Sequence, residues 1–343
     1  MACAAEMDSP PTGYRIGHCL DVLASVPDGA FNCCVTSPPY WGLRDYGDPG
    51  RDWPEVEYTP MPGCQPVTVP AMTAPLGLEP TVEAYVAHIV LVFREVARTL
   101  RDDGTLWLNL GDCYANDGKW GGSTGGKHVS ALHGSSGNVR GKRVTGLKPK
   151  DLVGIPWRVA FALQADGWWL RSDNVWAKTN PMPESVTDRT TRSHEFVFML
   201  TRSARYYYDT DAVREPATHG NHAGRTVFDS TPPTPPGTSP HRGLRHAPDA
   251  SAGRNRRTVW TVPTVPFPEA HFAVFPPDLA RPCILAGCPE GGTVLDPFLG
   301  SGTTGMVAES LGRRWFGVEQ CADYEPIIRK RTAQAGLIFA GGA

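Results

Sequence analysis

Residues 294–304 read Val-Leu-Asp-Pro-Phe-Leu-Gly-Ser-Gly-Thr-Thr, and this stretch decides the fold. Residues 293–295, Thr-Val-Leu, predict a short buried strand that runs into Asp296. Gly300 and Gly302 then form a loop, and residues 302–311 predict a helix. Glycines at such a turn let the backbone approach a ligand closely, and the start of the helix offers free N–H groups. The pattern predicts a cofactor loop between a strand and a helix.

Glu319 follows the next predicted strand, 314–318, where an acidic side chain suits the two hydroxyls of a ribose. The glycines by themselves leave the cofactor open, because Gly300, Gly302 and Gly305 also match a dinucleotide fingerprint. Asp296 favours another ligand than NAD. A carboxylate at the strand tip can hold the amino group of a methionine moiety, but it would be poorly placed beside a pyrophosphate.

Outward from this loop, strands alternate with helices. Strands are predicted at 31–36, 105–110, 168–177 and 195–201, and helices at 81–100 and 155–165. This alternation predicts an α/β fold with a largely parallel sheet. Two proline-rich stretches, 53–80 and 232–240, interrupt the pattern and are predicted to be loops or insertions.

The composition is that of an ordinary soluble globular protein: 343 residues, 41% hydrophobic, 20% charged, net charge −2. No apolar run approaches the ~20 residues of a membrane span, and the first residues lack the features of a signal peptide. We therefore expect a cytoplasmic protein with no membrane contact. The nine cysteines include no C-x-x-C pair, which favours reduced buried thiols and no metal site.

Positive charge is concentrated in two segments. Residues 118–150 contain no acidic residue and seven basic ones, and residues 214–257 hold seven arginines against three acidic residues. Basic segments on a near-neutral chain are typical of a polyanion held at one face, although each alone is equally typical of a solvated loop. The candidate contacts with such a polyanion in the first segment are Lys119, Lys127, Arg140, Lys142 and Arg143.

A rigid polar turn, Ser37-Pro38-Pro39-Tyr40, follows the predicted strand 31–36. Prolines stiffen the backbone and lack N–H groups. The Ser37 side chain and the Pro38 carbonyl can together accept both hydrogens of an exocyclic amine, which leaves the nitrogen lone pair facing an incoming methyl group. Tyr40 offers a flat face for an extruded base, with Trp41 beside it. We predict that this turn is the catalytic site.

These two motifs resemble those of the DNA amino-methyltransferases, the cytosine-N4 and adenine-N6 family. The family has a catalytic [Ser/Asn/Asp]-Pro-Pro-[Tyr/Phe], here at 37–40, and a cofactor motif Asp-Pro-Phe-x-Gly-x-Gly-Thr, here at 296–303. The catalytic motif comes first, as in the family's beta arrangement. The resemblance implies a Rossmann-like S-adenosylmethionine-dependent methyltransferase fold with a circularly permuted mixed sheet and inserted target-recognition loops. It adds Pro297, Phe298 and Thr303 to the expected cofactor site.

Further blocks resemble the same family. Gly17–Asp21 resembles a segment whose aspartate lies near the cofactor adenine, although His18 departs from the acidic or amide residue that the family often has there. Residues 271–277 resemble a segment that closes over the methionine end, which adds Phe272 and Phe275. Residues 176–178, with Lys178, and 183–186 resemble blocks near the target base.

On this basis the chain divides into five parts. Residues 14–117 and 151–210 form the catalytic half, and residues 263–338 form the cofactor-binding half. Residues 118–150 are a basic insertion with DNA contacts, and residues 211–262 are a second basic, proline-rich segment for target recognition.

The resemblance implies that the enzyme methylates a flipped base in double-stranded DNA with S-adenosylmethionine. In the family, Ser-Pro-Pro-Tyr goes mostly with cytosine-N4 methylation, so we expect that reaction; adenine-N6 methylation is the alternative, and methylation of RNA or protein amines is a more remote one. The resemblance also implies a bacterial or phage-infected cell, and it is compatible with a homodimer and with a restriction endonuclease partner. The recognition sequence is not encoded in any readable pattern.

Overall fold

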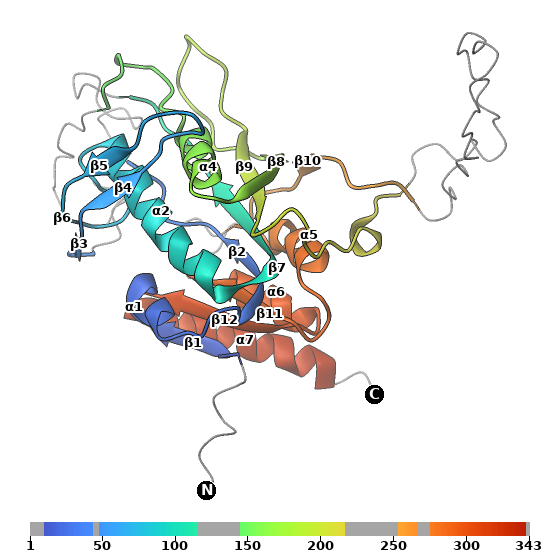
Figure 1. Ribbon diagram of the computed structural model, residues 1–343. Coiled ribbons are helices and arrows are strands. Elements are labelled where there is room, and N and C mark those ends of the chain that lie inside the picture. The colour runs from blue at the N-terminus through green and yellow to red at the C-terminus, as the bar shows by residue number, and fades with distance from the viewer. Residues whose placement is uncertain (1–9, 44–47, 116–144, 217–252, 266–274, 341–343) are drawn as a thin grey trace, which may run out of the picture.

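An eight-stranded mixed sheet forms the centre of the computed structural model, which describes residues 10–43, 48–115, 145–216, 253–265 and 275–340 (Figure 1). The strand order is β1-β12-β11-β2-β7-β9-β8-β10. The strands are β1 (Gly13–Ile16), β2 (Phe31–Thr36), β7 (Leu100–Leu110), β8 (Trp169–Ala177), β9 (His194–Thr201), β10 (Val259–Thr261), β11 (Thr293–Asp296) and β12 (Arg314–Glu319). Only the pairings of β9 with β7 and β8 are antiparallel. The predicted α/β class and mixed sheet are confirmed.

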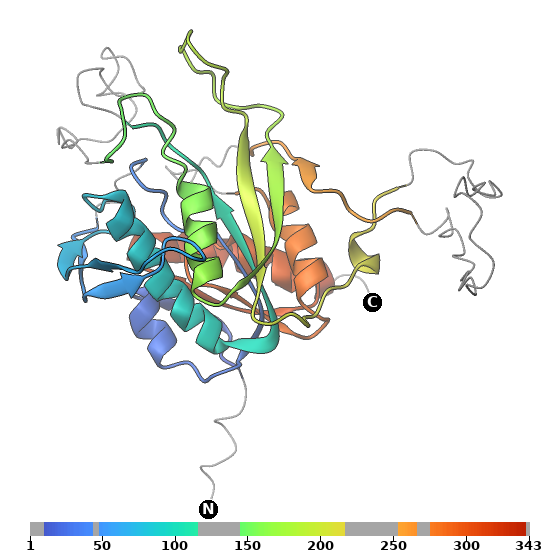
Figure 2. The same ribbon diagram turned by 45° about the horizontal axis from the view of Figure 1, so that its top comes forward.

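Helices cover both faces of this sheet (Figures 1 and 2). One face packs against α1 (Cys19–Ala24), α2 (Val82–Thr99) and α4 (Ile155–Ala165), and the other packs against α5 (Pro277–Gly287) and α6 (Thr303–Ser310). Alternating side chains of β2 divide between the two layers: Cys34 joins the first core, and Cys33 and Val35 join the second. Helix α7 (Glu325–Ala340) packs against α6.

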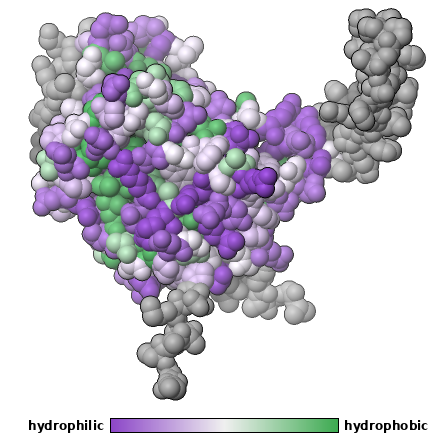
Figure 3. All heavy atoms as spheres, viewed as in Figure 1, coloured by the Kyte–Doolittle hydropathy of each residue, from purple (hydrophilic) through white to green (hydrophobic). Residues whose placement is uncertain are grey.

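The amphipathic pattern of 81–100 gives α2, as predicted. Its N-cap is Thr81, whose hydroxyl accepts a hydrogen bond from the Ala84 N–H at 3.1 Å. Tyr85, Ile89 and Phe93 all lie fully buried on its inner side. On the face seen in Figure 3, hydrophilic residues predominate and hydrophobic ones form limited patches. Within the described residues, no helix is long and apolar enough to cross a bilayer.

The prediction that residues 53–80 hold no regular element is wrong. Four short strands occur there, β3 (Arg51–Trp53), β4 (Val56–Tyr58), β5 (Val67–Val69) and β6 (Met72–Ala74). They form two small antiparallel sheets, β3 with β6 and β4 with β5. Every proline of the stretch lies outside these four strands, so none removes a ladder hydrogen bond. The second proline-rich stretch, 232–240, lies outside the described residues.

Both basic segments join the fold at paired backbone positions. On either side of residues 116–144, the Ala115 N–H donates to the Asp151 carbonyl and the Lys150 N–H donates to the Ala115 carbonyl, both at 2.8 Å. On either side of residues 217–252, Glu215 and Arg254 exchange two backbone hydrogen bonds of 2.9 and 2.8 Å. Each segment therefore leaves the fold and returns to it at one place. The proposed division of the chain into five parts stays a prediction.

Candidate active site

The two motifs meet where β2 and β11 end side by side. Val294 and Leu295 pair with Cys33 and Cys34 in parallel register, so both strands deliver their next residues to the same edge of the sheet. There the Thr36 hydroxyl donates a hydrogen bond of 2.7 Å to Asp296 Oδ1, across 260 residues of sequence. Ligands of open α/β sheets bind at the carboxyl ends of such strands. The predicted catalytic turn and cofactor loop therefore form one site.

Asp296 is the buried carboxylate of this site. Its Oδ1 also accepts from the Phe298 N–H at 3.1 Å, whereas Oδ2 is buried and has no partner among the described residues. Burial raises the pKa of Asp296 to about 6, and hydrogen bonds from neighbours oppose this only in part. The Thr303 hydroxyl is likewise buried and unpaired. Unpaired buried polar atoms are costly, so this pair fits a polar ligand such as the amino-acid end of the cofactor.

The glycine loop has the backbone that its sequence predicts. Gly300 and Gly302 have φ of 54° and 84°, which is the left-handed region that side chains disfavour. Gly300 donates its N–H to Glu319 Oε2 at 2.7 Å, and burial raises the pKa of Glu319. The third glycine, Gly305, lies inside α6 against Trp315, where an added Cβ would come within 2.8 Å of the indole. Gly305 therefore serves helix–strand packing.

The β1–α1 turn lies beside the same acid. The Gly17 N–H donates to the Glu319 carbonyl at 2.8 Å, which brings the Gly17–Asp21 block next to the predicted ribose acid. Asp21 itself is 66% exposed and pairs with Arg51 at 2.7 Å. His18 caps α1 by accepting from the Leu20 N–H, and burial with the nearby Arg51 lowers its pKa to about 4. The role of Asp21 at the adenine stays a prediction.

In the catalytic turn, only one of the two proline carbonyls is engaged. Tyr85 of α2 donates its hydroxyl to the Pro39 carbonyl at 2.9 Å. The Pro38 carbonyl has no hydrogen bond within the described part of the chain, so it is available as an acceptor. The Tyr40 ring lies against Gly111, where a Cβ would approach the ring to 2.6 Å. Ser37 and Tyr40 are both half-buried.

A polar cluster that the sequence did not predict surrounds the Tyr40 hydroxyl. Tyr40 donates to Glu195 Oε2 at 2.8 Å, and Ser37 Oγ donates to Tyr40 Oη at 3.2 Å. Asn109 Nδ2 donates to the same Glu195 oxygen at 3.1 Å, and Lys178 forms an ion pair with Glu195 Oε1. Of its members, the sequence predicts only Ser37, Tyr40 and Lys178 near the target base. For Glu195 the signal was an acidic residue at the start of the apolar run 195–201.

The remaining predicted site residues differ in where they lie. Trp41 is only 3% exposed, and its indole N–H donates to the Glu79 carbonyl at 3.1 Å, so it is a core residue and we no longer assign it to the DNA. Lys178 pairs with Glu195 and lies 4.6 Å from the centre of the Trp176 ring, at the active site. Phe275 packs in the second core, Phe298 is half-buried and Pro297 is buried. Phe272, Lys119, Lys127, Arg140, Lys142 and Arg143 lie outside the described residues.

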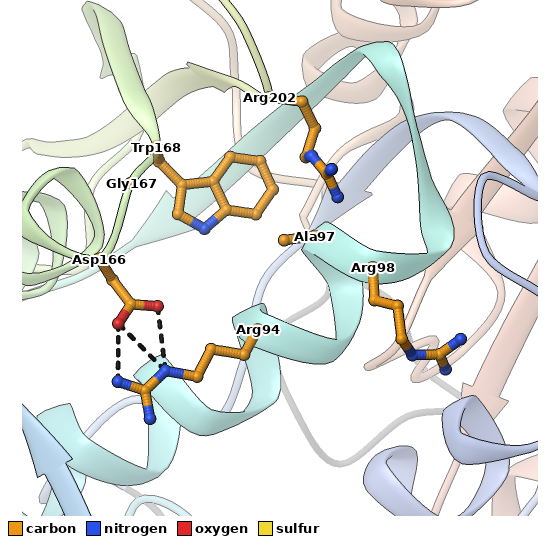
Figure 4. A pocket seen from close by; sticks show the side chains of 7 residues that line it. All are labelled: Arg94, Ala97, Arg98, Asp166, Gly167, Trp168 and Arg202. Carbon is orange, nitrogen blue, oxygen red and sulfur yellow. Dashed lines mark hydrogen bonds and ion pairs between the residues drawn. The ribbon is translucent and has the colours of Figure 1, made fainter.

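A surface pocket of about 360 Å³ lies apart from this site (Figure 4). Three arginines and Trp168 line it, but Arg94 is held by Asp166 at 2.7 Å and Arg98 by Glu95 and Asp28. Its lining includes no residue of either motif. Among the described residues, no three His, Cys, Asp or Glu side chains are grouped so as to hold a metal ion.

Solved structures share this fold at low sequence identity. The cytosine-N4-specific PvuII DNA methyltransferase matches with a TM-score of 0.55 and 17% identity, covering 97% of this chain and 93% of its own. A putative DNA modification methylase of Thermus thermophilus, solved with S-adenosyl-L-methionine, matches with a TM-score of 0.54 and 20% identity, covering 95% and 94%. Identities this low show the fold alone, which is that of Rossmann-like DNA methyltransferases.

Sequence relatives are closer. The type II methyltransferase M.SmaI of Serratia marcescens is 41% identical over 92% of this chain and 89% of its own length. M.Cfr9I of Citrobacter freundii, also a type II methyltransferase, is 44% identical over 92% and 85%. The DNA methylase family model of the N6 and N4 type matches residues 31–330. Because that match covers most of the chain and includes both motifs, the chain belongs to the N6/N4 DNA methylase family.

Proposed function

We propose that this enzyme transfers the methyl group of S-adenosylmethionine to the exocyclic N4 of cytosine in duplex DNA, with the target base flipped out of the helix. The observation that carries the proposal is the hydrogen bond between Thr36 and Asp296. It joins Asp296, the carboxylate that would hold the cofactor, to Thr36, the residue before the amine-accepting turn. A donor held at Asp296 and an amine held at Ser37 then approach each other, and positioning supplies much of the rate.

The cofactor supplies an electrophilic methyl group when it is bound. Asp296 Oδ2 and Thr303 Oγ1 are the buried unpaired atoms that would receive its amino-acid end. Glu319, at the end of β12, would accept from the ribose hydroxyls. Gly300 and Gly302 keep the loop backbone free of side chains, and Phe298 supplies a half-buried apolar surface. The donor set fits S-adenosylmethionine because it combines a carboxylate for a cation with an acid for hydroxyls.

The target amine is held by this chain's own acceptors. Ser37 Oγ and the Pro38 carbonyl accept its two hydrogens, while the Pro39 carbonyl is already occupied by Tyr85. The nitrogen lone pair is then directed at the methyl group. Tyr40, a half-buried residue whose ring lies against Gly111, stacks that ring on the flipped base.

Cytosine is favoured by Ser37 at the first position of the turn. The alternative is adenine-N6 methylation by the same machinery, and methylation of an RNA or protein amine is more remote. The basic segments favour a duplex substrate over a peptide. The named relatives are type II methyltransferases, so we also propose a place in a restriction–modification system. An endonuclease partner and a homodimer stay predictions.

The test uses bacterial DNA that has been amplified in vitro and so carries no methylation. The purified enzyme and S-adenosylmethionine are incubated with it, and the DNA is digested to nucleosides for mass spectrometry. N4-methylcytosine is the expected product, and Ser37→Ala is the control that should yield none. Detection of N6-methyladenine would show that the target base is adenine rather than cytosine. If the enzyme binds the cofactor but the DNA contains no methylated base, DNA is not the substrate.

A further inference from the structure

The Tyr40 hydroxyl links Ser37 to a carboxylate. Ser37 Oγ donates to Tyr40 Oη at 3.2 Å, and Tyr40 Oη donates to Glu195 Oε2 at 2.8 Å. The three side chains come from the catalytic turn and from β9, and they form one unbroken chain of hydrogen bonds. The chain begins at the residue that would accept the target amine.

Asn109 limits where the tyrosine proton can go. Its amide nitrogen donates to Glu195 Oε2 at 3.1 Å and to the Phe196 carbonyl at 3.0 Å, which fixes the amide orientation. Its carbonyl oxygen then lies 3.0 Å from Tyr40 Oη. Two acceptor oxygens therefore face one hydroxyl proton, but only Glu195 is basic enough to keep a transferred proton.

Glu195 is placed to receive a proton and to release it. Its side chain is 14% exposed and pairs through Oε1 with Lys178, which comes from the end of β8. His194, the preceding residue, interacts electrostatically with Glu195, Arg192 and Lys178. The ammonium of Lys178 balances the carboxylate before the reaction, and the small exposed area gives the proton a route to water afterwards.

Methylation of an amine requires a proton acceptor. When the target nitrogen forms its bond to the methyl carbon, the carbon–sulfur bond breaks and the nitrogen must lose one of its two protons. Asp296 is not placed to accept it, because its Oδ1 already accepts from Thr36 and Phe298 and its Oδ2 would hold the cationic amino group of the cofactor. The Pro38 carbonyl cannot hold a proton at neutral pH. Ser37 can take the proton only if it passes its own proton on.

We propose that Glu195 is the proton acceptor of the reaction and acts through Tyr40 and Ser37, an inference that rests on the proposed amine methylation. As the nitrogen–carbon bond forms, the amine proton moves to Ser37 Oγ, the Ser37 proton moves to Tyr40 Oη, and the Tyr40 proton moves to Glu195. Both hydroxyls end neutral and the Glu195 carboxylate ends protonated. The positive charge that the sulfonium loses is therefore carried by the proton now on Glu195. Glu195 does not touch the substrate, so it is a positioning and relay residue.

The test measures single-turnover methyl transfer to the same unmethylated amplified DNA, with enzyme in excess and cofactor saturating. Glu195→Gln keeps the size and a hydrogen-bond acceptor but removes the base, and Tyr40→Phe keeps the ring but breaks the chain. General bases contribute typically 10²–10⁴-fold. We expect each variant to be slower by about 100-fold or more, with unchanged binding of S-adenosylmethionine and DNA. Because the two act in one chain, the double variant should be no slower than the single ones.

Two further variants separate a proton acceptor from a merely structural residue. Glu195→Ala should regain part of its rate when formate is added, whereas chloride at equal ionic strength should have no effect. Glu95→Gln is the matched control: Glu95 is also held in an ion pair, with Arg98, but it lies on α2 away from the catalytic turn, and its loss should leave the rate unchanged.

The outcomes distinguish the relay from the proposed function. A Glu195→Gln enzyme with the wild-type single-turnover rate would overturn the relay and leave the methyltransferase intact. So would rate losses that multiply in the double variant, or a Glu195→Ala enzyme that formate does not restore. A wild-type enzyme that methylates no DNA base would instead overturn the proposed function itself.

Discussion

Tyr85 of α2 donates its hydroxyl to the Pro39 carbonyl at 2.9 Å, and this bond connects a core helix to the catalytic turn. Tyr85 is fully buried and Pro39 is half-buried, so the bond is partly shielded from water. Together with the stiffness of two prolines, it fixes the orientation of the peptide groups on either side. The neighbouring Pro38 carbonyl is thereby left as the acceptor for a substrate.

We predict that Tyr85→Phe slows methyl transfer by about 10-fold, because a partly buried carbonyl left without its partner costs on the order of 1 kcal/mol and lets the turn shift. Binding of S-adenosylmethionine should be unaffected. Tyr58→Phe is the matched control, since Tyr58 is a buried tyrosine of β4 away from the turn. Single-turnover kinetics of the two variants check this; equal rates would show that the bond does not position Pro39.

Ser37→Ala should reduce methyl transfer by at least about 100-fold, because the variant lacks one of the two acceptors of the target amine. Tyr40→Ala should also remove most activity. In both variants the cofactor site is unaltered, so calorimetric titration with S-adenosylmethionine should give the wild-type affinity. Loss of cofactor binding in either variant would contradict the separation between the two motifs.

The pKa of Asp296 predicts a pH-dependent affinity for the cofactor. Burial raises that pKa to about 6, and a cationic ammonium binds the ionised carboxylate. The affinity for S-adenosylmethionine should therefore fall as pH decreases through about 6, and binding below that pH should release a proton. Calorimetry in buffers of different ionisation heats measures both effects. Asp296→Asn should bind weakly at every pH and show no such dependence.

The same pKa predicts how stability depends on pH when the cofactor is absent. A carboxyl that holds its proton more tightly in the folded state stabilises the fold at low pH. For Asp296 this contribution is complete below its ordinary pKa of 3.8 and is lost as pH rises to about 6. Comparing the free energies of unfolding of the wild type and Asp296→Asn over this range isolates the effect. A constant difference between them would contradict it.

Gly111→Ala should impair catalysis by displacing Tyr40. An added Cβ would lie 2.6 Å from the ring, and the Gly111 backbone has no left-handed φ, so the effect is purely steric. Overpacking of this kind costs typically 1–3 kcal/mol unless the ring moves. We expect a lower methyl-transfer rate and unchanged cofactor affinity. An alanine variant with full activity would show that Tyr40 tolerates the shift.

The basic residues of the first insertion should govern the salt dependence of DNA binding. Exchanging Lys119, Lys127, Arg140, Lys142 and Arg143 for glutamine removes their contacts with phosphates. Each lost contact should reduce the slope of log K against log salt by about 0.9. Binding isotherms at several salt concentrations measure this slope. An unchanged slope would show that the segment is a solvated loop that does not contact the DNA phosphates.

The local parts of the site could be predicted from the sequence. Residues 294–304 form a strand, a glycine turn and a helix because each step depends on neighbours along the chain, and Thr81 caps α2 in the same way. The proximity of the two motifs follows from parallel strands that end at one edge. Such features need no knowledge of distant packing.

The cluster around Tyr40 could not be predicted, because it depends on which strands pair. Asn109 and Glu195 meet through the antiparallel register of β7 and β9, in which Asn109 lies opposite Val197. No local pattern encodes that pairing. Trp41 was misassigned for a similar reason: an aromatic residue after a catalytic turn is equally typical of a core, and only the Glu79 carbonyl decides between them.

The backbone hydrogen bonds that join the two ends of each basic segment have an evolutionary consequence. Since Ala115 meets Asp151 and Glu215 meets Arg254 through the backbone, neither joint depends on what lies between. Lengthening a closed loop costs only about 0.6 kcal/mol per doubling. Segments of different length and sequence can therefore be exchanged between relatives without disturbing the catalytic edge. Where these segments recognise the target, as we predict, a lineage built on this scaffold can change its target sequence by recombination at two fixed joints while the catalytic edge is inherited unchanged.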